Sequence, residues 1–239
     1  MAVTFDGPLM WLFGGRGEAA CALNDVWIFD ARAWSWQRPT VSGVPPSARW
    51  GHSAALVTVR GRIVVLGGQE AAGAFTADVH LFDLGTLTWS SVEVCGKVPP
   101  ARAALSAVSD RCTDDALATI WTFGGEGKST RLFGFGATDA VFSDLHRLQL
   151  EPPASAPAAV PSATAAASPP SCLRATAEIM LPAESARPLR PAPRAHHQAV
   201  LLQHPARLVV YGGGDSKGLI GVPSSALVPR APAGVPGVP

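Results

Sequence analysis

The stretch RIVVLGG at residues 62–68 is a short apolar run that stops at two glycines. Similar runs stand at 9–15 (LMWLFGG), 119–125 (TIWTFGG) and 207–214 (RLVVYGGG). Short runs rich in β-branched and aromatic residues and bounded by glycine are typical of β-strands. The first glycine of the pair recurs after 53 residues and then after 57, which indicates a chain built from repeated units.

Other residues recur in the same register on both sides of the glycines. The segment PPSARWGHSA around Arg49 returns 53 residues later as PPARAALSA around Arg102, and again as PAPRAHHQA around Arg194. An aspartate before the next apolar run and a tryptophan near the end of the unit recur at the same interval. Each unit therefore supplies four short strands joined by turns, which predicts the blade of a radial β-propeller.

This combination of motifs resembles the kelch repeat family, over about residues 5–216. The matching elements are the paired glycines, the Asp-Val-Trp-x-Phe-Asp strand, the fourth-strand Trp and the Pro-x-x-Arg-x-x-His segment. The third repeat lacks that Trp, ARAALSA lacks the His, and no Asp-Val strand follows Gly213. The resemblance implies an all-β, kelch-type β-propeller whose recurrent residues are packing and polar anchors. These are Gly14, Gly15, Asp25, Trp36, Arg49, His52, Gly67, Gly68, Asp78, Trp89, Arg102, Gly124, Gly125, Asp144, Arg194, Gly212 and Gly213.

The glycine pairs have a steric explanation in such a fold. Strands crowd together near a propeller axis, and a residue without Cβ lets the chain turn sharply where neighbouring backbones approach. We therefore expect the glycines to build the blade rather than to bind a ligand.

The predicted strands do not close a ring. They make up strands two to four of a first blade, complete second and third blades, and two strands of a fourth, all within residues 1–216. We therefore expect an incomplete propeller of about three blades of four antiparallel strands, since propellers close with four to eight blades. The missing blades would come from a longer chain or from another subunit. The first source is favoured because an open strand edge invites aggregation.

Two segments are predicted to stay unfolded. Residues 151–172 form an insert within the third blade, and 18 of the 21 residues at 151–171 are Ala, Pro or Ser. Such a composition buries little apolar surface and interrupts both helix and sheet. The same reasoning applies to the Pro-rich tail at 217–239. We expect a binding site in neither segment.

Composition and motifs exclude several classes of function. The formal charge of +1 gives no broad electrostatic attraction to nucleic acid or to an anionic membrane. The four cysteines form no C-x-x-C pair, so we expect reduced thiols. The sequence GKS at 127–129 lacks the earlier glycine of a phosphate-binding loop. With no signal peptide and no long apolar run, the expected location is cytoplasmic or nucleocytoplasmic.

No catalytic, cofactor-binding or metal-binding residue stands out. The chain has a single tyrosine, whereas the copper sites of kelch-type copper oxidases use two tyrosines. No Ser/His/Asp or Cys/His arrangement for nucleophilic catalysis can be identified from spacing. The six histidines fall mainly at repeat positions. No cofactor is expected.

The connections that follow the glycine pairs differ between units while the frame repeats. Loops on a rigid frame are where binding residues usually lie, so we expect a protein partner to contact this face. The candidate contact residues are Arg16, Glu18, Glu70, Lys128, Arg131, Phe133 and Phe135. The expected function is a non-enzymatic protein-interaction scaffold. Two alternatives stay open: the accessory propeller of a tRNA wybutosine-synthesising methyltransferase, which the chain also resembles, and a kelch-propeller enzyme with a metal or sugar substrate.

Overall fold

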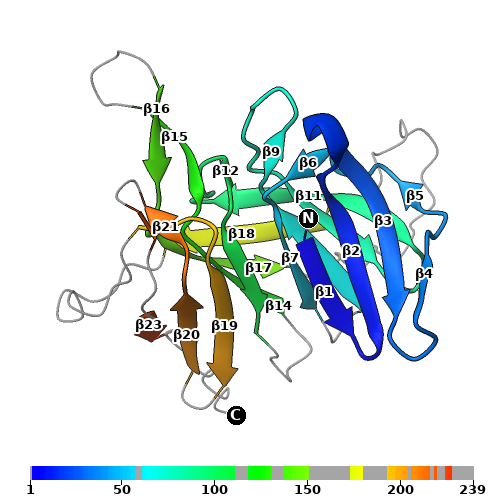
Figure 1. Ribbon diagram of the computed structural model, residues 1–239. Helices are drawn as coiled ribbons and strands as arrows, with labels where there is room; N and C mark the ends of the chain where they lie inside the picture. The colour runs from blue at the N-terminus through cyan, green and yellow to red at the C-terminus, as the bar shows by residue number, and fades with distance from the viewer. Residues whose placement is uncertain are drawn as a thin grey trace, which may run out of the picture.

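The computed structural model describes residues 2–57, 61–110, 118–130, 137–150, 173–179, 193–203, 206–215, 218–219 and 224–227. Within them, four β-sheet units follow one another along the chain (Figure 1), and we call them blades 1 to 4. Apart from one short 3-10 turn, Glu18–Ala20, the described elements are strands. No helix in these ranges is long and apolar enough to span a membrane.

The blades are built from antiparallel strands in chain order. Blade 1 comprises β1 (Ala2–Asp6), β2 (Leu9–Arg16), β3 (Ala22–Asp30) and β4 (Ser35–Gln37). Blade 2 comprises β7 (Ser53–Val57), β8 (Arg62–Leu66), β10 (Val79–Asp83) and β11 (Thr88–Gly96), and blade 3 comprises β13 (Ser106–Ser109), β14 (Ala118–Phe123), β17 (Leu145–Leu150) and β18 (Leu173–Ile179). Blade 4 comprises β19 (Gln198–Gln203), β20 (Ala206–Tyr211) and β23 (Ser224–Leu227).

Shorter strands lie in the connections. Between blades these are β5 (Ser42–Gly43), β6 (Arg49–Trp50) and β12 (Arg102–Ala103). Between the second and third strands of a blade they are β9 (Gln69–Glu70), which pairs with β6, β15 (Glu126–Thr130), which pairs with β12 and with β16 (Ala137–Val141), and β21 (Gly214–Asp215), which pairs with β22 (Gly218–Leu219).

Two strands differ from the sequence-based expectation. The first blade has four strands rather than three, because Asp6-Gly7-Pro8 turns the chain and lets β1 pair with β2; Gly7 has a φ of 56°. The fourth blade has a third strand, because Ser224–Leu227 pairs with β20. This strand lies within the tail at 217–239, which the composition predicts to be unfolded. The insert at 151–172 lies outside the described residues.

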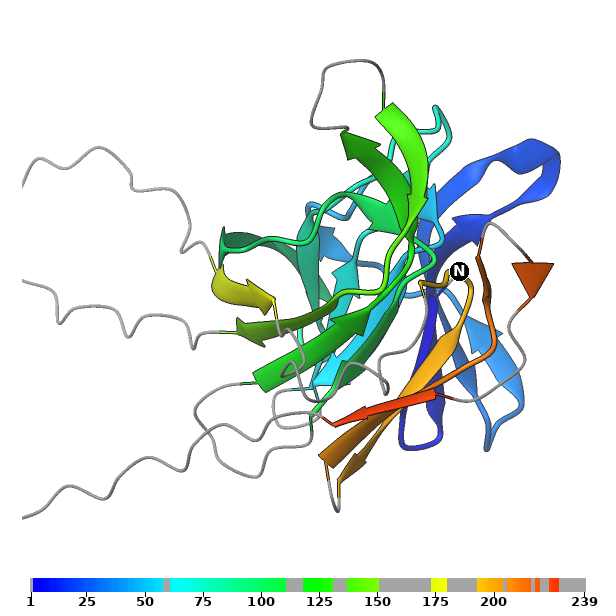
Figure 2. The same cartoon turned by 90° about the vertical axis from the view of Figure 1, so that its left-hand side faces the viewer.

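The first strand of each blade faces a common axis. Strand β7 contacts β1 on one side and β13 on the other, and β13 also contacts β19. Together these strands line a hollow of about 440 Å³. Two hydrogen bonds join β7 to β13: the Ala107 amide donates to Oγ of Ser53 at 2.9 Å, and Oγ of Ser109 donates to the Leu56 carbonyl at 2.5 Å. Figure 2 shows the sheets splaying outward from this axis.

The hydrophobic core lies between the blades. Strand β8 explains why, because its side chains point alternately to two neighbours. Ile63 and Val65 pack with blade 1, whereas Val64 and Leu66 pack toward blade 3. A strand buried on both faces must be apolar at every position, which accounts for the uninterrupted run in RIVVLGG.

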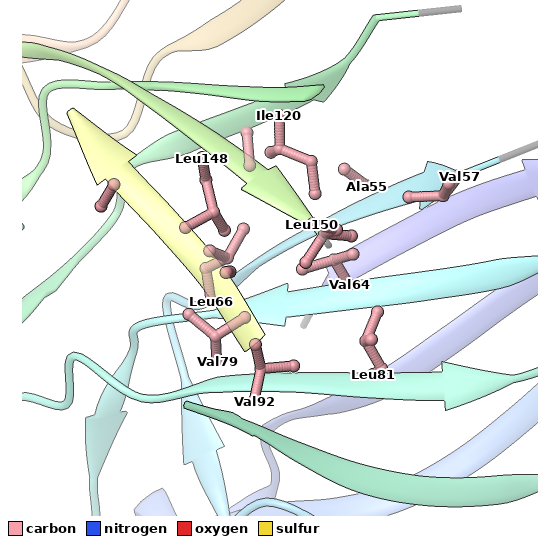
Figure 3. Packing of buried hydrophobic residues seen from close by; sticks show 13 residues of the cluster. Ala55, Val57, Val64, Leu66, Val79, Leu81, Val92, Ile120, Leu148 and Leu150 are labelled. Carbon is pink, nitrogen blue, oxygen red and sulfur yellow. The ribbon is translucent and has the colours of Figure 1, made fainter. Parts of the chain in front are cut away.

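The largest cluster fills the space between blades 2 and 3 (Figure 3). It includes Val64, Leu81, Ile120 and Leu148 among its buried side chains. A second cluster, with Trp11, Phe13, Phe82 and Trp89, joins blades 1 and 2, and a third joins blades 3 and 4. At the outer rim, β11 pairs in parallel with β18, so blades 2 and 3 form one continuous sheet.

Candidate functional site

The paired glycines hold the segment that leads into the following blade. Gly67 has a φ of 61°, and a Cβ at this position would lie 2.6 Å from the carbonyl oxygen of Arg102. Gly124 repeats the arrangement with a φ of 63° and the carbonyl oxygen of Arg194 at 2.6 Å. The next glycine of each pair donates its amide to the same carbonyl, from Gly68 at 2.8 Å and from Gly125 at 2.9 Å. The pairs therefore act through close backbone contact between blades.

The remaining doublets adopt the same kind of backbone. Gly14, Gly15, Gly212 and Gly213 all have positive φ, and a Cβ on Gly213 would lie 2.5 Å from the Ala195 carbonyl oxygen. In the described residues, near these glycines or elsewhere, no cluster of three His, Cys, Asp or Glu could hold a metal ion.

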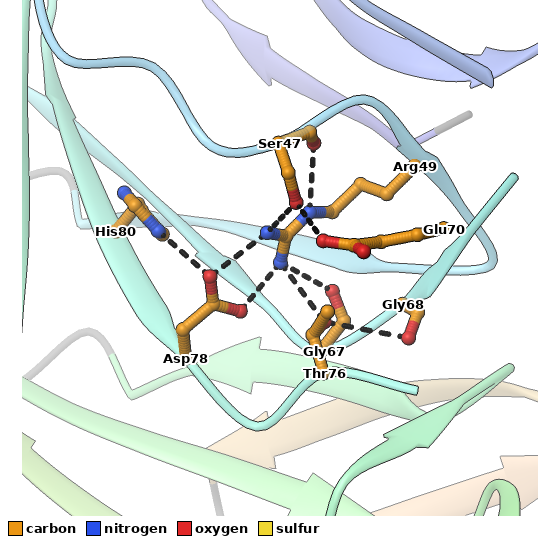
Figure 4. Close-up of polar contacts among 8 residues, drawn as sticks. All are labelled: Ser47, Arg49, Gly67, Gly68, Glu70, Thr76, Asp78 and His80. Carbon is orange, nitrogen blue, oxygen red and sulfur yellow. Dashed lines mark hydrogen bonds and ion pairs between the residues drawn. The ribbon is translucent and has the colours of Figure 1, made fainter. Parts of the chain in front are cut away.

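Arg49 is the centre of a polar network at the end of blade 2 where β8 stops and β10 begins (Figure 4). Its side chain is 1% exposed, and its two Nη atoms donate to both carboxylate oxygens of Asp78, at 2.5 and 2.8 Å. Nη1 also donates to the Gly67 carbonyl at 3.1 Å and to Oγ1 of Thr76 at 3.0 Å. A buried guanidinium is tolerated when its donors are satisfied in this way.

The Ser47 hydroxyl connects this network to the loop above it. Ser47 Oγ accepts from Nη2 of Arg49 at 2.7 Å and donates to Oε1 of Glu70 at 2.5 Å. Glu70, a predicted partner contact, is therefore also part of the frame.

Blade 3 repeats the network with Arg102 in place of Arg49. Its Nη atoms donate to both oxygens of Asp144 at 2.6 and 2.9 Å, and Nη1 donates to the Gly124 carbonyl at 2.9 Å. The Phe142 ring lies 4.1 Å from the guanidinium carbon, within the range of a cation–π contact. In blade 4, Arg194 is buried too, and its Nη1 donates to the Gly212 carbonyl at 3.2 Å.

The two carboxylates are held in the charged form. Burial raises the pKa of Asp78, but hydrogen bonds from Arg49 and His80 outweigh burial, so the net pKa lies below its ordinary value. Asp144 has a lowered pKa for the same reasons, with Arg102 and His146 as donors. His80 and His146 each contact their aspartate through Nε2, at 2.9 and 2.8 Å.

Two further histidines lie between neighbouring blades. Nε2 of His52 donates to the Phe13 carbonyl at 3.0 Å, and burial lowers the pKa of His52 to about 3. Nε2 of His197 lies 2.9 Å from Oγ of Ser106, and burial lowers its pKa to about 4. Both are neutral packing residues near pH 7. His197 follows Arg194 by three residues, as His52 follows Arg49, so both histidines occupy the Arg-x-x-His position of the repeat.

The connections that follow the glycine pairs lie at one end of the molecule, with β9, β15 and β16 projecting there (Figure 1). Arg16 is exposed and its guanidinium carbon lies 5.2 Å from the Trp50 ring centre; Glu18 is exposed in the 3-10 turn. Lys128 is exposed and pairs with Asp139 across the β15–β16 hairpin. Arg131, Phe133 and Phe135 lie outside the described residues.

The axial hollow is lined mainly by apolar side chains. Its lining is made of aliphatic, phenyl and hydroxyl side chains from the first strand of each blade, with Thr4 and Ser109 as its hydroxyl groups. Such a surface can contact an apolar segment, and the described residues that line it include no acid, base or thiol.

One repeated glycine position is missing from the sequence-based predictions. Gly43 and Gly96 are 53 residues apart, both with positive φ, and a Cβ on them would lie 2.1 Å from the carbonyl oxygen of Trp89 and 2.5 Å from that of Ala177. Each glycine pairs in parallel with the outer strand of the next blade. Ala177 is therefore the blade 3 counterpart of Trp89. The constant interval between the glycines is the signal that could have revealed them, whereas the insert hides the position of Ala177.

The comparisons with known proteins agree with this architecture. The family model described as "KLHDC2/KLHL20/DRC7 Kelch-repeats domain" matches residues 1–153. Rat Kelch domain-containing protein 3 is 41% identical over 95 residues, covering 39% of this chain and 24% of that protein. Rat Rab9 effector protein with kelch motifs is 34% identical over 95 residues, covering 39% of this chain and 25% of that protein.

The solved structure described as "Structure of YjhT" matches with a TM-score of 0.51 and 16% identity, covering 88% of this chain and 57% of that one. At this identity the likeness concerns the fold alone. The chain spans about a quarter of the length of the two curated relatives.

Proposed function

Since the chain belongs to the kelch-repeat family and has its all-β propeller fold, we propose that it is a non-enzymatic scaffold that binds a protein partner through the connections after its glycine pairs. The observation that carries the proposal is that blades 1, 2 and 3 send these connections to the same end of the molecule. They are residues 16–22, 69–77 and the β15–β16 hairpin.

The frame beneath the connections supports this role. The Arg49 and Arg102 networks fix the base of the second and third connections, since each guanidinium bonds both the glycine-pair carbonyl and the aspartate that ends the connection. Binding residues held on such a frame lose less conformational freedom when a partner binds. One relative is also named as an effector of Rab9, which is a role defined by a partner. The matches lend no support to the tRNA-methyltransferase or enzymatic alternatives.

The test is a quantitative pull-down from cell extract with the hairpin altered. Replacing residues 129–138 by a short Gly-Ser turn removes the projecting part but keeps Phe142 on Arg102 and the pairing of β15 with β12. We expect the specific partner to be lost while the circular dichroism spectrum and melting temperature are kept.

The matched control replaces Ala31–Ala33, an exposed turn between β3 and β4, by Gly-Ser residues. Partner recovery should be unchanged in this variant. Equal loss of the partner in both variants would contradict the proposal. So would full recovery of the partner in the hairpin variant together with full recovery in variants of residues 16–22 and 69–77.

A further inference from the structure

His146 uses only one of its two ring nitrogens in the polar network of blade 3. Its Nε2 lies 2.8 Å from Oδ2 of Asp144, and the same oxygen accepts from Nη2 of Arg102 at 2.9 Å. The His146 side chain is 1% exposed, and its Nδ1 is buried with no hydrogen-bond partner among the described residues. A buried ring nitrogen is unfavourable unless another group satisfies it.

The network determines which hydrogen-bonding role is open at Nδ1. Burial raises the pKa of Asp144, but hydrogen bonds from Arg102 and His146 lower it further, so Asp144 is a carboxylate at neutral pH and can only accept. Nε2 of His146 therefore carries the hydrogen that it donates to Asp144. In a neutral imidazole the lone pair then lies on Nδ1, which is an acceptor that needs a donor.

The repeat shows that the contact with the aspartate requires no second nitrogen. In blade 1 the residue at the position of His146 is Trp27, whose Nε1 donates to Oδ2 of Asp25 at 2.8 Å. An indole supplies one N–H donor and no acceptor. The acceptor on His146 is therefore not needed to hold the frame, and the space beside it decides what it can bind.

His146 lines a small cavity between blades 2 and 3, with a volume of about 30 Å³. Leu66, Val79 and Leu148, which are labelled in Figure 3, form part of its apolar wall. Residues 98–100, in the segment that leads into blade 3, line it as well. The cavity therefore lies within the contact between two complete blades.

A second polar side chain faces the same space. Thr122 is buried, lines the cavity, and stands directly opposite His146 in the pairing of β14 with β17. Side chains directly opposite each other in an antiparallel pair have Cβ atoms about 5 Å apart. The Thr122 hydroxyl is thus within reach of a small molecule that contacts the His146 ring.

The size of the cavity selects the ligand. A water molecule needs roughly 10–15 Å³ and usually makes 2–4 hydrogen bonds, whereas pockets for metabolites are about ten times larger than this cavity or more. We propose that the cavity binds an ordered water molecule, which donates a hydrogen bond to Nδ1 of His146 and contacts the Thr122 hydroxyl. The water links the Asp144 network to the contact between blades 2 and 3, whether or not a protein partner binds the connections above.

The test is nuclear magnetic resonance of the full chain with labelled methyl groups and histidine nitrogens. Nuclear Overhauser cross-peaks should join the water resonance to the methyl groups of Leu66 and Leu148, which are buried away from bulk solvent. Long-range proton–nitrogen spectra should show His146 protonated at Nε2 and not at Nδ1. Xenon, which binds dry apolar cavities, should leave these methyl resonances unchanged.

The variant His146→Leu removes the acceptor and leaves an apolar side chain of similar size. The water cross-peaks at Leu66 and Leu148 should be lost, and xenon should now shift these resonances, because the cavity becomes dry. Thr122 is unchanged in this variant, so exchange of its hydroxyl cannot produce the difference. His80→Leu is the matched control, because His80 makes the same contact with Asp78 in blade 2 but does not line the cavity, and it should keep the wild-type cross-peaks.

Circular dichroism shows whether both variants are folded, and the wild-type spectra test the proposal by themselves if His146→Leu is not. Absence of the water cross-peaks in the wild type would overturn the proposal. A hydrogen on Nδ1 of His146, a xenon shift in the wild type, or cross-peaks that persist in folded His146→Leu would overturn it as well.

Discussion

Arg102 shows how single residues hold this fold together. Its guanidinium is 3% exposed and makes four hydrogen bonds, two of them to Asp144, while Phe142 covers one face. Removing one partner of such a pair leaves the other charge buried and unsatisfied, which is more damaging than the net contribution of the pair itself. The effect of losing the arginine should differ from blade to blade. In blade 1, Asp25, the counterpart of Asp78, accepts from Nε1 of Trp27 and contacts no guanidinium within the part of the chain that the structure describes.

We expect Arg102→Gln to destabilise the chain by about 3–5 kcal/mol, the usual effect of leaving a buried carboxylate without its guanidinium. Asp25→Asn should change the free energy of unfolding by less than about 1 kcal/mol, since it removes a charge that no guanidinium compensates. Urea unfolding followed by tryptophan fluorescence measures both. An equally large loss in the two variants would contradict the interpretation of these sites.

Stability should fall as the pH drops from about 6.5 toward 4. His52 and His197 have folded-state pKa values lowered to about 3 and about 4 by burial, so in this range the unfolded chain binds protons that the folded chain does not. Asp78 and Asp144 have lowered pKa values, and the stability they contribute is lost only at more acidic pH, below the ordinary aspartate pKa of 3.8.

Urea titrations at a series of pH values measure this dependence. His52→Gln should reduce the slope between pH 6.5 and 4, because glutamine can donate to the Phe13 carbonyl without taking up a proton. If the change of stability with pH is the same in His52→Gln and in His197→Gln as in the wild type, groups other than these histidines cause the pH dependence.

At the scale of elements, turns and strand edges determine how the blades meet. In blades 2 and 3 a glycine pair follows the second strand at the point where the next arginine segment crosses it, so the same two residues fix both the backbone conformation and the contact between blades. The parallel pairing of β11 with β18 also depends on a glycine, because Gly96 has a positive φ and a Cβ there would lie 2.5 Å from the Ala177 carbonyl oxygen.

A pair of glycine substitutions separates backbone strain from contact. Gly61 and Gly67 have similar φ values of 55° and 61°, but a Cβ on Gly61 would have nothing within 4 Å. We expect Gly61→Ala to cost about 1 kcal/mol, from the positive φ alone. Gly67→Ala should cost at least about 2 kcal/mol more, because the new methyl group would collide with the Arg102 carbonyl. Thermal unfolding measures the difference, and equal losses would show that contact between blades is unimportant here.

The strands of this fold could be predicted because each has a strong local signal. The run before each glycine pair and the 53-residue interval place β2, β8, β10 and β14 correctly. Strand β23 could not be predicted, because its residues lie in a Pro-rich segment and become a strand only through pairing with β20. The loop residues of the proposed site have no such signal, since their arrangement depends on the curvature of the whole assembly.

At the scale of the whole molecule, the two outermost blades present apolar surface. On blade 4, Val200, Leu202 and Tyr211 are exposed, opposite to the side chains that pack toward blade 3. Strand β23 covers the edge of β20 that would otherwise be free. An uncovered edge beside exposed apolar side chains favours association between chains.

A chain shortened to end at residue 215 should therefore associate more strongly than one ending at residue 227. The first lacks β23 and the second keeps it. Light scattering at increasing concentration measures the association, and near-identical curves would indicate that β23 does not protect the edge.

The continuous sheet of blades 2 and 3 has a consequence for the connectivity of the chain. Strands β17 and β18 are adjacent and antiparallel, and β18 is also bonded to β11, although residues 151–172 lie between β17 and β18 in the sequence. A proteolytic cut between them would leave two fragments with complementary strand edges and a shared hydrophobic cluster. Residues 1–150 and 173–239, produced separately and then mixed, should consequently assemble into one folded complex.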